Sequence, residues 1–263
     1  MNTEHGEAHP ETGAVIRLDS WARAIREYRN LTRPEAQEAT GISQHTLKDI
    51  EYNRTHARPD IIESLITGYQ LDDAQARLTR ELCQPPATLP PAHQLRERIT
   101  PARRSLLTIL DATLALAYLD PLWNVLTAND RFFRIFPGLR VADNLALWAL
   151  PPSPEPSPAK PMLTDPRREA QWLVGTLRGT FAHYRDDPRV TSLYQQLKRN
   201  EIFNHYWHND IHVAHGRRLD NQPLRLRDPA TGQRYTLSVQ LTEVTDLPEI
   251  RGFLFWPHTD TTE

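Results

Sequence analysis

The stretch 32–58, TRPEAQEATGISQHTLKDIEYNRTHAR, constrains the fold of this chain more than any other segment. Thr32 and Glu35 have the spacing of a capping box, in which each side chain accepts a hydrogen bond from a backbone N–H at the start of a helix. Gly41 suits the left-handed conformation that turns a chain sharply after a helix. Ser43 suits the N-cap of a second helix. The spacing therefore predicts two short helices joined by a tight turn, followed by a polar loop.

The second of these helices is predicted to have one apolar and one polar face. Leu47 and Ile50 lie three residues apart, so they share the face that packs into the domain. The opposite face carries Gln44, His45 and Lys48, whose side chains form hydrogen bonds. A helix-turn-helix places such a face in the major groove of DNA. The pattern favours a DNA-binding motif over its alternative, an ordinary antiparallel helix pair in a core.

Nine side chains are predicted to contact DNA. Those on the second helix would read base edges, and Gln44 can form two hydrogen bonds to adenine. Basic and polar side chains around the helix would hold phosphates, which fixes the register without reading sequence. The nine are Gln44, His45, Thr46 and Lys48 on the helix, Ser43 at its cap, and Arg33, Asn53, Arg54 and Arg58 around it.

This segment resembles the XRE (lambda-repressor-like) family. The matching residues are Ile25-Arg26, Arg29, Leu31 and Thr32 before the first helix, Gly41-Ile42-Ser43 at the turn, and Ile50-Glu51, Asn53-Arg54 and Pro59 after the second helix. The chain has Ala36-Gln37 where the family has a Leu-Ala pair, and Gln37 is expected at the close contact between the helices. The resemblance implies an all-α DNA-binding domain of five short helices, which we place at residues 15–83.

Length and composition limit the remaining choices. A chain of 263 residues can hold two domains with real cores, and its formal net charge of −2 means that DNA affinity has to come from a local patch. A single cysteine excludes intrachain disulfides and fits a reducing compartment. We expect a cytoplasmic protein without membrane contact, because the chain has neither a run of ~18 apolar residues nor a signal-peptide pattern. Residues 1–14 and 259–263 are expected to be tails, the first disordered.

Two Pro-Pro pairs, Pro85-Pro86 and Pro90-Pro91, predict a linker at residues 84–94 and a second domain at 95–258. Strands are expected at 114–119, 124–127, 211–214, 223–227, 235–243 and 252–256, and helices at 101–112, from 129, at 143–149, 167–185 and 190–199, and around 203–207. This order predicts an α+β fold with helices on one face of an antiparallel sheet, a layout that can enclose a ligand cavity. The Pro/Ser-rich stretch 151–161 is predicted to be a mobile surface insertion that adds nothing to the core.

The second domain resembles the MmyB-like ligand-binding domain, a PAS-like module that follows an XRE-type reader in transcription regulators. The features that carry the resemblance are Ala117–Asp130 (AYLDPLWNVLTAND), Asn144-Leu145, and Asp186-Asp187-Pro188-Arg189 followed by Leu193, Phe203, Trp207 and Asp210-Ile211. The insertion 151–161 and the turn 228–232 depart from the family pattern. The resemblance implies a PAS-like fold with an antiparallel sheet. It also implies a small ligand that is apolar or amphiphilic, such as a fatty acid or a secondary metabolite.

The aromatic content of the second domain supports an apolar ligand. Aromatic pockets with few polar groups suit acyl chains, although each of these rings could equally build the core. Trp123 lies at a predicted turn, where a Trp is rarely needed for packing alone. Asn129 and Tyr118 could donate hydrogen bonds to a carbonyl or carboxylate, but Asn129 could also cap a helix. The predicted ligand-binding residues are Tyr118, Trp123, Leu126, Asn129, Phe132, Phe133, Trp148, Phe203 and Trp207.

Catalytic and metal-binding patterns are weak. His205, His208, His212 and His215 form a cluster, and two of them have the i,i+4 spacing of metal ligands on a helix. The β-branched residues near His212 indicate that the helix ends before it, which favours structural roles. The chain has no HExxH, GxGxxG, GxxxxGK[ST] or GxSxG motif. We therefore expect no enzyme activity, no cofactor and no metal.

Together these patterns predict a ligand-responsive transcription factor that binds double-stranded operator DNA, a small apolar or amphiphilic ligand and a second copy of itself. A homodimer is expected because one helix-turn-helix makes few base contacts. One alternative is a ligand-independent adaptor whose second domain serves dimerisation or partner contact. Another is a metabolite-modifying enzyme with a vestigial helix-turn-helix.

Overall fold

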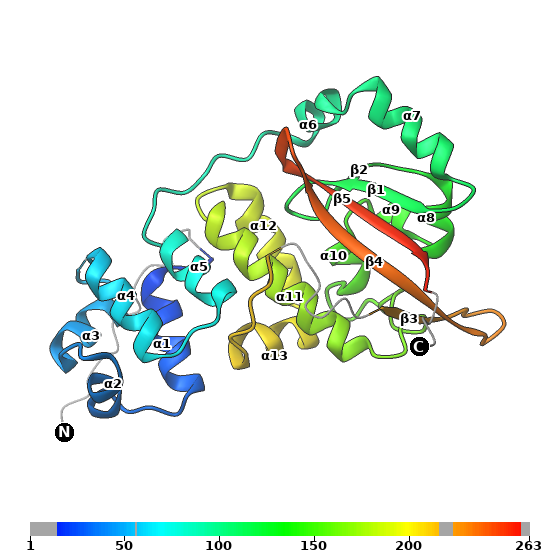
Figure 1. Ribbon diagram of the computed structural model, residues 1–263. Helices are drawn as coiled ribbons and strands as arrows, with labels where there is room; N and C mark the ends of the chain where they lie inside the picture. Colours follow the sequence, from blue (N-terminus) through cyan, green and yellow to red (C-terminus); the bar gives the residue numbers. More distant parts are fainter. Residues whose placement is uncertain (1–14, 56, 216–222, 259–263) are drawn as a thin grey trace, which may run out of the picture.

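The computed structural model describes residues 15–55, 57–215 and 223–258. Figure 1 shows a bundle of helices at the N-terminal end and, after an extended connection, a larger unit built on a twisted sheet. The predicted tails at 1–14 and 259–263 lie outside the described residues. Within the described ranges, every helix is too short or too polar to cross a bilayer.

The N-terminal unit contains five short helices, as predicted. They are α1 (Leu18–Tyr28), α2 (Arg33–Thr40), α3 (Gln44–Glu51), α4 (Pro59–Gly68) and α5 (Asp73–Glu81). Trp21, Ile25, Leu47 and Leu65 fill its core and are at most 2 % exposed. The Trp21 indole N–H donates to the Thr79 hydroxyl at 2.9 Å, which ties the first helix to the last. An apolar centre with one satisfied polar contact holds the bundle together.

The predicted signals around α2 and α3 are confirmed. The Glu35 carboxylate accepts from the Thr32 N–H at 2.7 Å, and the Thr32 side chain accepts from the Glu35 N–H. Gly41 ends α2 with φ +71°, a conformation that residues with a Cβ rarely adopt. The Ser43 hydroxyl accepts from the Thr46 N–H and so caps α3. Local hydrogen bonding therefore sets both ends of the turn.

The C-terminal unit contains the predicted antiparallel sheet. Its strands are β1 (Ala115–Leu119), β2 (Val125–Ala128), β3 (Leu224–Arg227), β4 (Arg234–Val244) and β5 (Leu247–Pro257), in the order β2-β1-β5-β4-β3. The central strand β5 pairs with β1 and β4, and Phe253 lies opposite Ala117 on one side and Leu241 on the other. The fold is therefore an all-α unit followed by an α+β unit, as expected.

Helices cover the sheet unevenly. They are α6 (Ala92–Arg98), α7 (Pro101–Leu110), α8 (Asp130–Ile135), α9 (Leu139–Ala142), α10 (Leu145–Ala149), α11 (Pro166–His183), α12 (Pro188–Leu197) and α13 (Glu201–Asn209). Phe253 and Phe255 share one face of β5 and contact Trp172 of α11 and Phe132 of α8. Figure 1 shows α7 on the other side of β1 from α8 and α9. Figure 1 shows α6 next to α7, so the expectation that helices lie on one face holds for most of them, and α6 and α7 are the exceptions.

The insertion 151–161 packs against the rest of the domain, so the expectation that it adds nothing to the core is wrong. Ala159 is 1 % exposed. The Ser157 hydroxyl donates to the Ala149 carbonyl at 2.6 Å, and the Ser153 N–H donates to the Arg199 carbonyl at 3.3 Å. Alanine and serine are small enough to pack closely against neighbouring backbone. The prediction considered only that the segment is polar and Pro-rich.

Residues 211–214 do not form the predicted strand. They run in extended form beside α11, where the Ala214 N–H donates to the Gly175 carbonyl at 3.1 Å. A Cβ on Gly175 would lie 2.7 Å from the His212 ring, so this close approach requires glycine. Alternating Ile211 and Val213 are buried, as in a strand, but the neighbour is a helix and not a sheet edge.

A buried arginine holds the segment 211–214 against α11. The Arg178 guanidinium on α11 donates to the carbonyls of Tyr206, Trp207, Asp210 and His212. Burial lowers the pKa of Arg178 to about 10, so the side chain stays charged at neutral pH. One cation thus serves the carbonyls at the end of α13 and the segment that follows it, groups that a helix end leaves unsatisfied.

The two units contact each other through α5 and α11. The Gln75 amide donates to the Ile211 carbonyl at 3.1 Å, and the His215 imidazole is 3.0 Å from the Ala74 carbonyl. The connection between the units is also held, because the Ala87 N–H donates to the His183 carbonyl at 2.9 Å. Figure 1 shows α5 beside α11. Hydrogen bonds to backbone carbonyls of both units therefore dock the helical bundle on the α+β unit.

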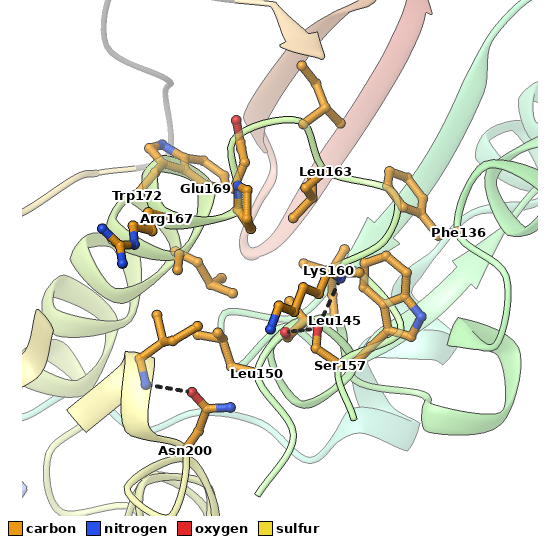
Figure 2. A pocket seen from close by; sticks show the side chains of 18 of the residues that line it. Phe136, Leu145, Leu150, Ser157, Lys160, Leu163, Arg167, Glu169, Trp172 and Asn200 are labelled. Atoms are coloured by element: carbon orange, nitrogen blue, oxygen red, sulfur yellow. Dashed lines mark hydrogen bonds between the residues drawn. The ribbon is translucent and has the colours of Figure 1, made fainter. Parts of the chain in front are cut away.

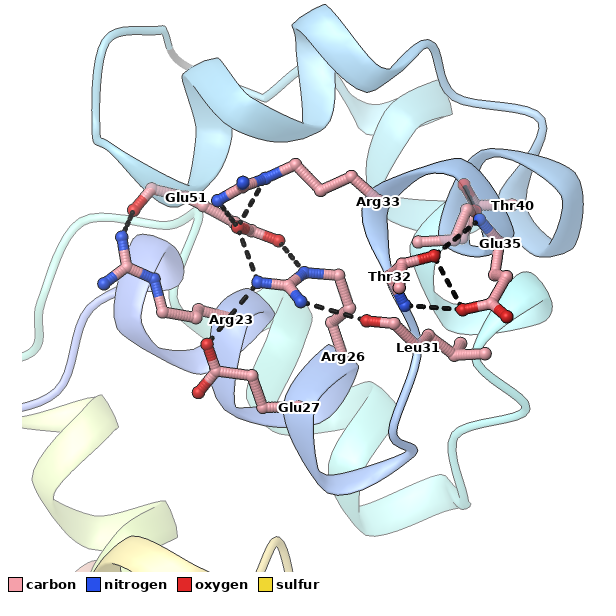
Figure 3. A network of polar contacts seen from close by, with 10 residues as sticks. Arg23, Arg26, Glu27, Leu31, Thr32, Arg33, Glu35, Thr40 and Glu51 are labelled. Atoms are coloured by element: carbon pink, nitrogen blue, oxygen red, sulfur yellow. Dashed lines mark hydrogen bonds and ion pairs between the residues drawn. The ribbon is translucent and has the colours of Figure 1, made fainter.

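A buried ion network joins the first three helices (Figure 3). The Glu51 carboxylate, whose side chain is 1 % exposed, receives Arg26 at 2.5 Å and Arg33 at 2.7 Å. Arg26 also donates to the Leu31 carbonyl at the α1–α2 connection. Burial opposes ionisation of Glu51, but hydrogen bonds and charge from the two arginines outweigh it and lower its pKa. Glu51 therefore fixes α3 against α1 and α2.

Replacing Glu51 by Gln should lower the free energy of unfolding of the helical bundle by about 3 kcal/mol, because it leaves a buried arginine without its counter-charge. The difference from wild type should be complete above the ordinary pKa of a glutamate and should shrink as the pH falls through the lowered pKa of folded Glu51. Urea unfolding across a pH series measures both effects. The exposed control Glu38→Gln should show neither, and equal stability of Glu51→Gln and wild type would contradict the role assigned to the network.

Candidate functional site

The exposed face of α3 carries the predicted base-reading residues. Gln44, His45 and Lys48 are exposed, and Thr46 is half-buried. The His45 imidazole lies 2.9 Å from the Asp49 carboxylate, one turn further along the helix. The structure therefore brings the four together on one accessible surface, with His45 paired to an acidic neighbour.

Gln37 lies beside α3, as expected from its position at the contact between the helices, but at the exposed edge of that contact. It is exposed, and its side-chain oxygen accepts from the Gln44 N–H at 3.1 Å. The buried residues of α2 are Ala36 and Thr40, and the Thr40 hydroxyl donates to the Ala36 carbonyl. Gln37 thus satisfies an amide at the first turn of α3, next to the cap formed by Ser43. The unusual Ala-Gln pair supports the geometry of the motif.

The predicted phosphate-binding residues differ in their surroundings. Arg54 is exposed and lies 5.3 Å from the Tyr52 ring, while Arg58 is paired with Asp60 at 3.2 Å. Arg33 is engaged by Glu51, as described above. Asn53 is exposed and has φ +53°, a conformation that Asn tolerates better than most residues.

Arg33 and Arg54 are among the residues that line a hollow beside α3. Its lining includes four cations and one acid, which are Arg26, Arg33, Lys48, Arg54 and Asp49. Since Arg26 and Arg33 share the single charge of Glu51, the surface keeps a positive excess although the whole chain is slightly acidic. Positive charge next to a polar helix face is the arrangement that holds a DNA backbone.

An apolar cavity of 330 Å³ lies between the helices and the sheet (Figure 2). Its walls are formed by α10, α11, the insertion 151–161 and the sheet. The aromatic residues among its walls are Phe136, Trp148, Trp172, Phe253 and Phe255. The volume is within the lower range of small-molecule sites, and the walls are mainly apolar as in such sites.

A few polar groups lie at this cavity. Lys160 and Arg167 are exposed, and in Figure 2 the Lys160 side chain points toward the lining residues whereas Arg167 points outward. Asn200 also lines it, but its side-chain oxygen accepts from the N–H groups of Ile202 and Phe203 at the start of α13. Of the two cations that line the cavity, Lys160 is therefore the one placed to meet a polar end of a ligand.

Trp148 is the one predicted ligand-binding residue that lines this cavity. Asn129 instead caps α8, and its amide group serves the backbone of Phe132, Leu116 and Leu114. The other predicted residues lie elsewhere in the domain. Tyr118 and Leu126 are buried in the sheet. Phe132 and Phe133 belong to α8, where their rings contact each other. Phe203 stacks on Trp207 beside α11.

Trp123 stands behind the cavity wall. It is fully buried with φ +68°, and its ring makes edge contacts with Trp172 and Phe253, both of which line the cavity. Its indole N–H is buried without a partner among the described residues. Trp123 thus supports lining residues and does not line the cavity itself.

Several lining residues were not predicted as ligand contacts. Trp172 lies on a long helix, and Phe253 and Phe255 alternate along a strand, so their patterns indicated only core positions. The alternation of two phenylalanines with smaller residues was the available signal, since it marks one face of the central strand. Nothing in the sequence of the insertion 151–161, apart from its small residues, indicated that it forms part of the cavity wall.

The histidine cluster is divided by the end of α13 at Asn209, as the β-branched residues indicated. His212 and His215 lie against Gly175 and Gly179 of α11. Burial lowers the pKa of both, which keeps them neutral. Across the part of the chain that the structure describes, no three His, Cys, Asp or Glu side chains come together as a possible metal site.

Comparison with known families identifies both units. Residues 99–263 match the model described as MmyB-like transcription regulator ligand binding domain. Residues 22–78 match a helix-turn-helix domain. A search of curated proteins gave no significant match. The cavity lies within the first match, and α2 and α3 lie within the second.

Removing the Gln37 side chain should weaken the start of α3. Gln37→Ala is expected to lower the free energy of unfolding of the helical bundle by roughly 1 kcal/mol, because a hydrogen bond to the first turn is lost. Amide hydrogen exchange should also become faster at Gln44. The neighbouring exposed variant Glu38→Ala should leave that exchange rate unchanged, and unchanged exchange in Gln37→Ala would refute the capping role.

Proposed function

The chain belongs to the family of the MmyB-like transcription regulator ligand binding domain, and from this premise we propose how it reads DNA and what it senses. With its helix-turn-helix domain it is a ligand-responsive transcription regulator. We propose that α3 reads the operator and that the apolar cavity binds a small, largely apolar or amphiphilic molecule. The cavity between α10, α11, the insertion and the sheet is the observation that carries this proposal.

The surface of α3 supports sequence-specific recognition. Gln44 and Lys48 are exposed on the helix that a helix-turn-helix inserts into the major groove. Arg54 follows directly after it and adds positive charge where a phosphate would lie. Because a single small reader makes few base contacts, we propose that two copies bind a palindromic or repeated site.

The chemistry of the cavity supports a ligand with an apolar body. Trp148, Trp172 and Phe253 offer flat apolar surfaces to an acyl chain or a polyketide-like ring system. Lys160 could hold a carboxylate or carbonyl at one end of such a molecule. A cavity of this size also favours a sensor over a ligand-independent adaptor, which would have no need of one.

Helix α11 offers a physical route between ligand and DNA. Its first half lines the cavity through Trp172, and its second half packs on α5 of the DNA-binding unit. A ligand changes the DNA affinity only if it binds the DNA-competent and incompetent arrangements with different affinity. We propose that a shift of α11 accompanies that difference.

The DNA-reading role is tested with DNA flanking the gene and a scrambled duplex in a polarisation assay across a salt series. Gln44→Ala should reduce discrimination between them by about tenfold or more, since a bidentate base contact contributes roughly 1–3 kcal/mol. Arg54→Ala should weaken binding to both duplexes alike and reduce the salt slope by about one. Unchanged discrimination in Gln44→Ala would show that Gln44 does not read a base.

The ligand-binding role is tested with dodecanoate as a probe and tryptophan fluorescence as the readout, because Trp148 and Trp172 line the cavity. Ala170→Phe places a ring in the cavity and should weaken binding about tenfold or more, since each displaced CH₂ contributes about 0.8 kcal/mol. Ala102→Phe, at an exposed position on α7, is the matched control and should bind as wild type does. Equal binding by both variants would place the ligand elsewhere. The DNA affinity of Ala170→Phe and Ala102→Phe, measured with and without a lipid extract, tests whether a ligand in the cavity changes DNA binding.

A further inference from the structure

Tyr52, the C-cap residue of α3, has three arginines around its exposed ring. The Cζ atoms of Arg23, Arg33 and Arg54 lie 5.0, 5.8 and 5.3 Å from the centre of the ring. At these distances an aromatic ring attracts a guanidinium through a cation–π interaction. The arginines belong to α1, to the start of α2 and to the loop after α3. One aromatic side chain therefore collects positive charge from three separate segments.

Two of these guanidiniums are also held by Glu51, the residue before Tyr52. Arg23 Nη2 donates to the Glu51 carbonyl at 3.1 Å, and Arg33 Nη2 is 2.7 Å from the Glu51 carboxylate. Figure 3 shows both arginine side chains directed toward Glu51. An arginine that is already fixed loses little side-chain freedom when it binds an oxyanion.

Acidic groups do not neutralise these three arginines. Within the described ranges, Glu51 is the one acid that forms an ion pair with any of them, and its partner among the three is Arg33. Arg23 and Arg54 form no ion pair with a described residue. The group therefore keeps a net positive charge. Like charges held close together repel one another, so an anion in contact with them would be favourable.

The three arginines adjoin the surface that carries the proposed base-reading residues. Arg33 and Arg54 also line the hollow beside α3, together with Gln44 and Lys48. The phosphate backbone of DNA borders the major groove, in which a helix-turn-helix places its second helix. The end of α3 at Tyr52 is therefore a position that a backbone phosphate can approach.

We propose that Tyr52, Arg23, Arg33 and Arg54 form a phosphate clamp for the DNA backbone. Arg23 is then a phosphate-binding residue that the sequence did not indicate. Tyr52 is a positioning residue, because its ring keeps the guanidiniums together before DNA binds. The clamp rests on the proposed reading of DNA by α3, and it adds a backbone contact that fixes the register of that helix.

The clamp is tested in the polarisation assay described for Gln44→Ala, with the same two duplexes and salt series. Arg23→Gln should weaken binding to both duplexes alike and reduce the salt slope by about one, because one phosphate contact is lost. Tyr52→Leu should weaken binding to both several-fold. Tyr52→Phe keeps an aromatic ring and should bind within about twofold of wild type. In the Arg23→Gln/Arg54→Gln background the effect of Tyr52→Leu should largely disappear, since the ring then has two fewer cations to hold.

Two matched controls lie outside the clamp. Tyr28 is 52 % exposed and Tyr52 is 48 % exposed, but within the described ranges no arginine lies over the Tyr28 ring. Arg80 is an exposed arginine of α5 that is paired with Glu63 at 2.7 Å. Tyr28→Leu and Arg80→Gln should leave both the affinity and the salt slope unchanged.

The proposal is overturned if Tyr52→Leu binds as Tyr28→Leu does, or if Arg23→Gln keeps the salt slope of Arg80→Gln. Because Tyr52 is exposed, its substitution is compatible with the fold, and far-UV circular dichroism checks that each variant is folded. If Gln44→Ala loses discrimination while the clamp variants bind as wild type does, the clamp alone is wrong. Absence of DNA binding by wild type overturns both the clamp and the reading of DNA by α3.

Discussion

The arrangement of the whole chain depends on how Arg178 satisfies the end of α13. Four carbonyl groups converge on one buried guanidinium, so the segment that follows α13 is held against α11 without a neighbouring strand. That segment then presents the Ile211 carbonyl and the His215 ring to α5. Helix α11 therefore contributes to the cavity wall, to the packing of the segment after α13 and to the contact between the units. Its Arg178 cation fixes that segment.

The helix-turn-helix could be predicted closely because its structure follows from local rules. Thr32, Gly41 and Ser43 act on neighbours within a few residues, and such short-range capping is visible in sequence. The exception was Gln37, whose partner is seven residues away across the turn. The sheet was also predictable in type and nearly in extent, since alternation marks its faces. The prediction of a strand at 211–214 was wrong because the alternation of apolar residues indicates which side chains are buried. It does not indicate whether the neighbouring element is a strand or a helix.

The cavity was harder to predict because its walls come from segments far apart in the chain. Trp148 and Phe253 are separated by 105 positions in the chain and line the same cavity from helix α10 and strand β5. Aromatic content indicated the right domain but not which rings face the empty space. Trp123 illustrates the difficulty, because its unusual position at a turn signalled importance, yet it supports the wall from behind. The predicted domain boundaries and DNA contacts remain predictions.

One wall of the cavity is made by residues 151–161, a connection between α10 and α11 that belongs to neither helix nor sheet. Loops tolerate changes in length and sequence far better than the strands they border. The volume and charge of the cavity can therefore change through this loop while the helices and strands that border it keep their sequence. In evolutionary terms, the specificity of such a ligand-binding domain can drift through one loop while the fold stays fixed.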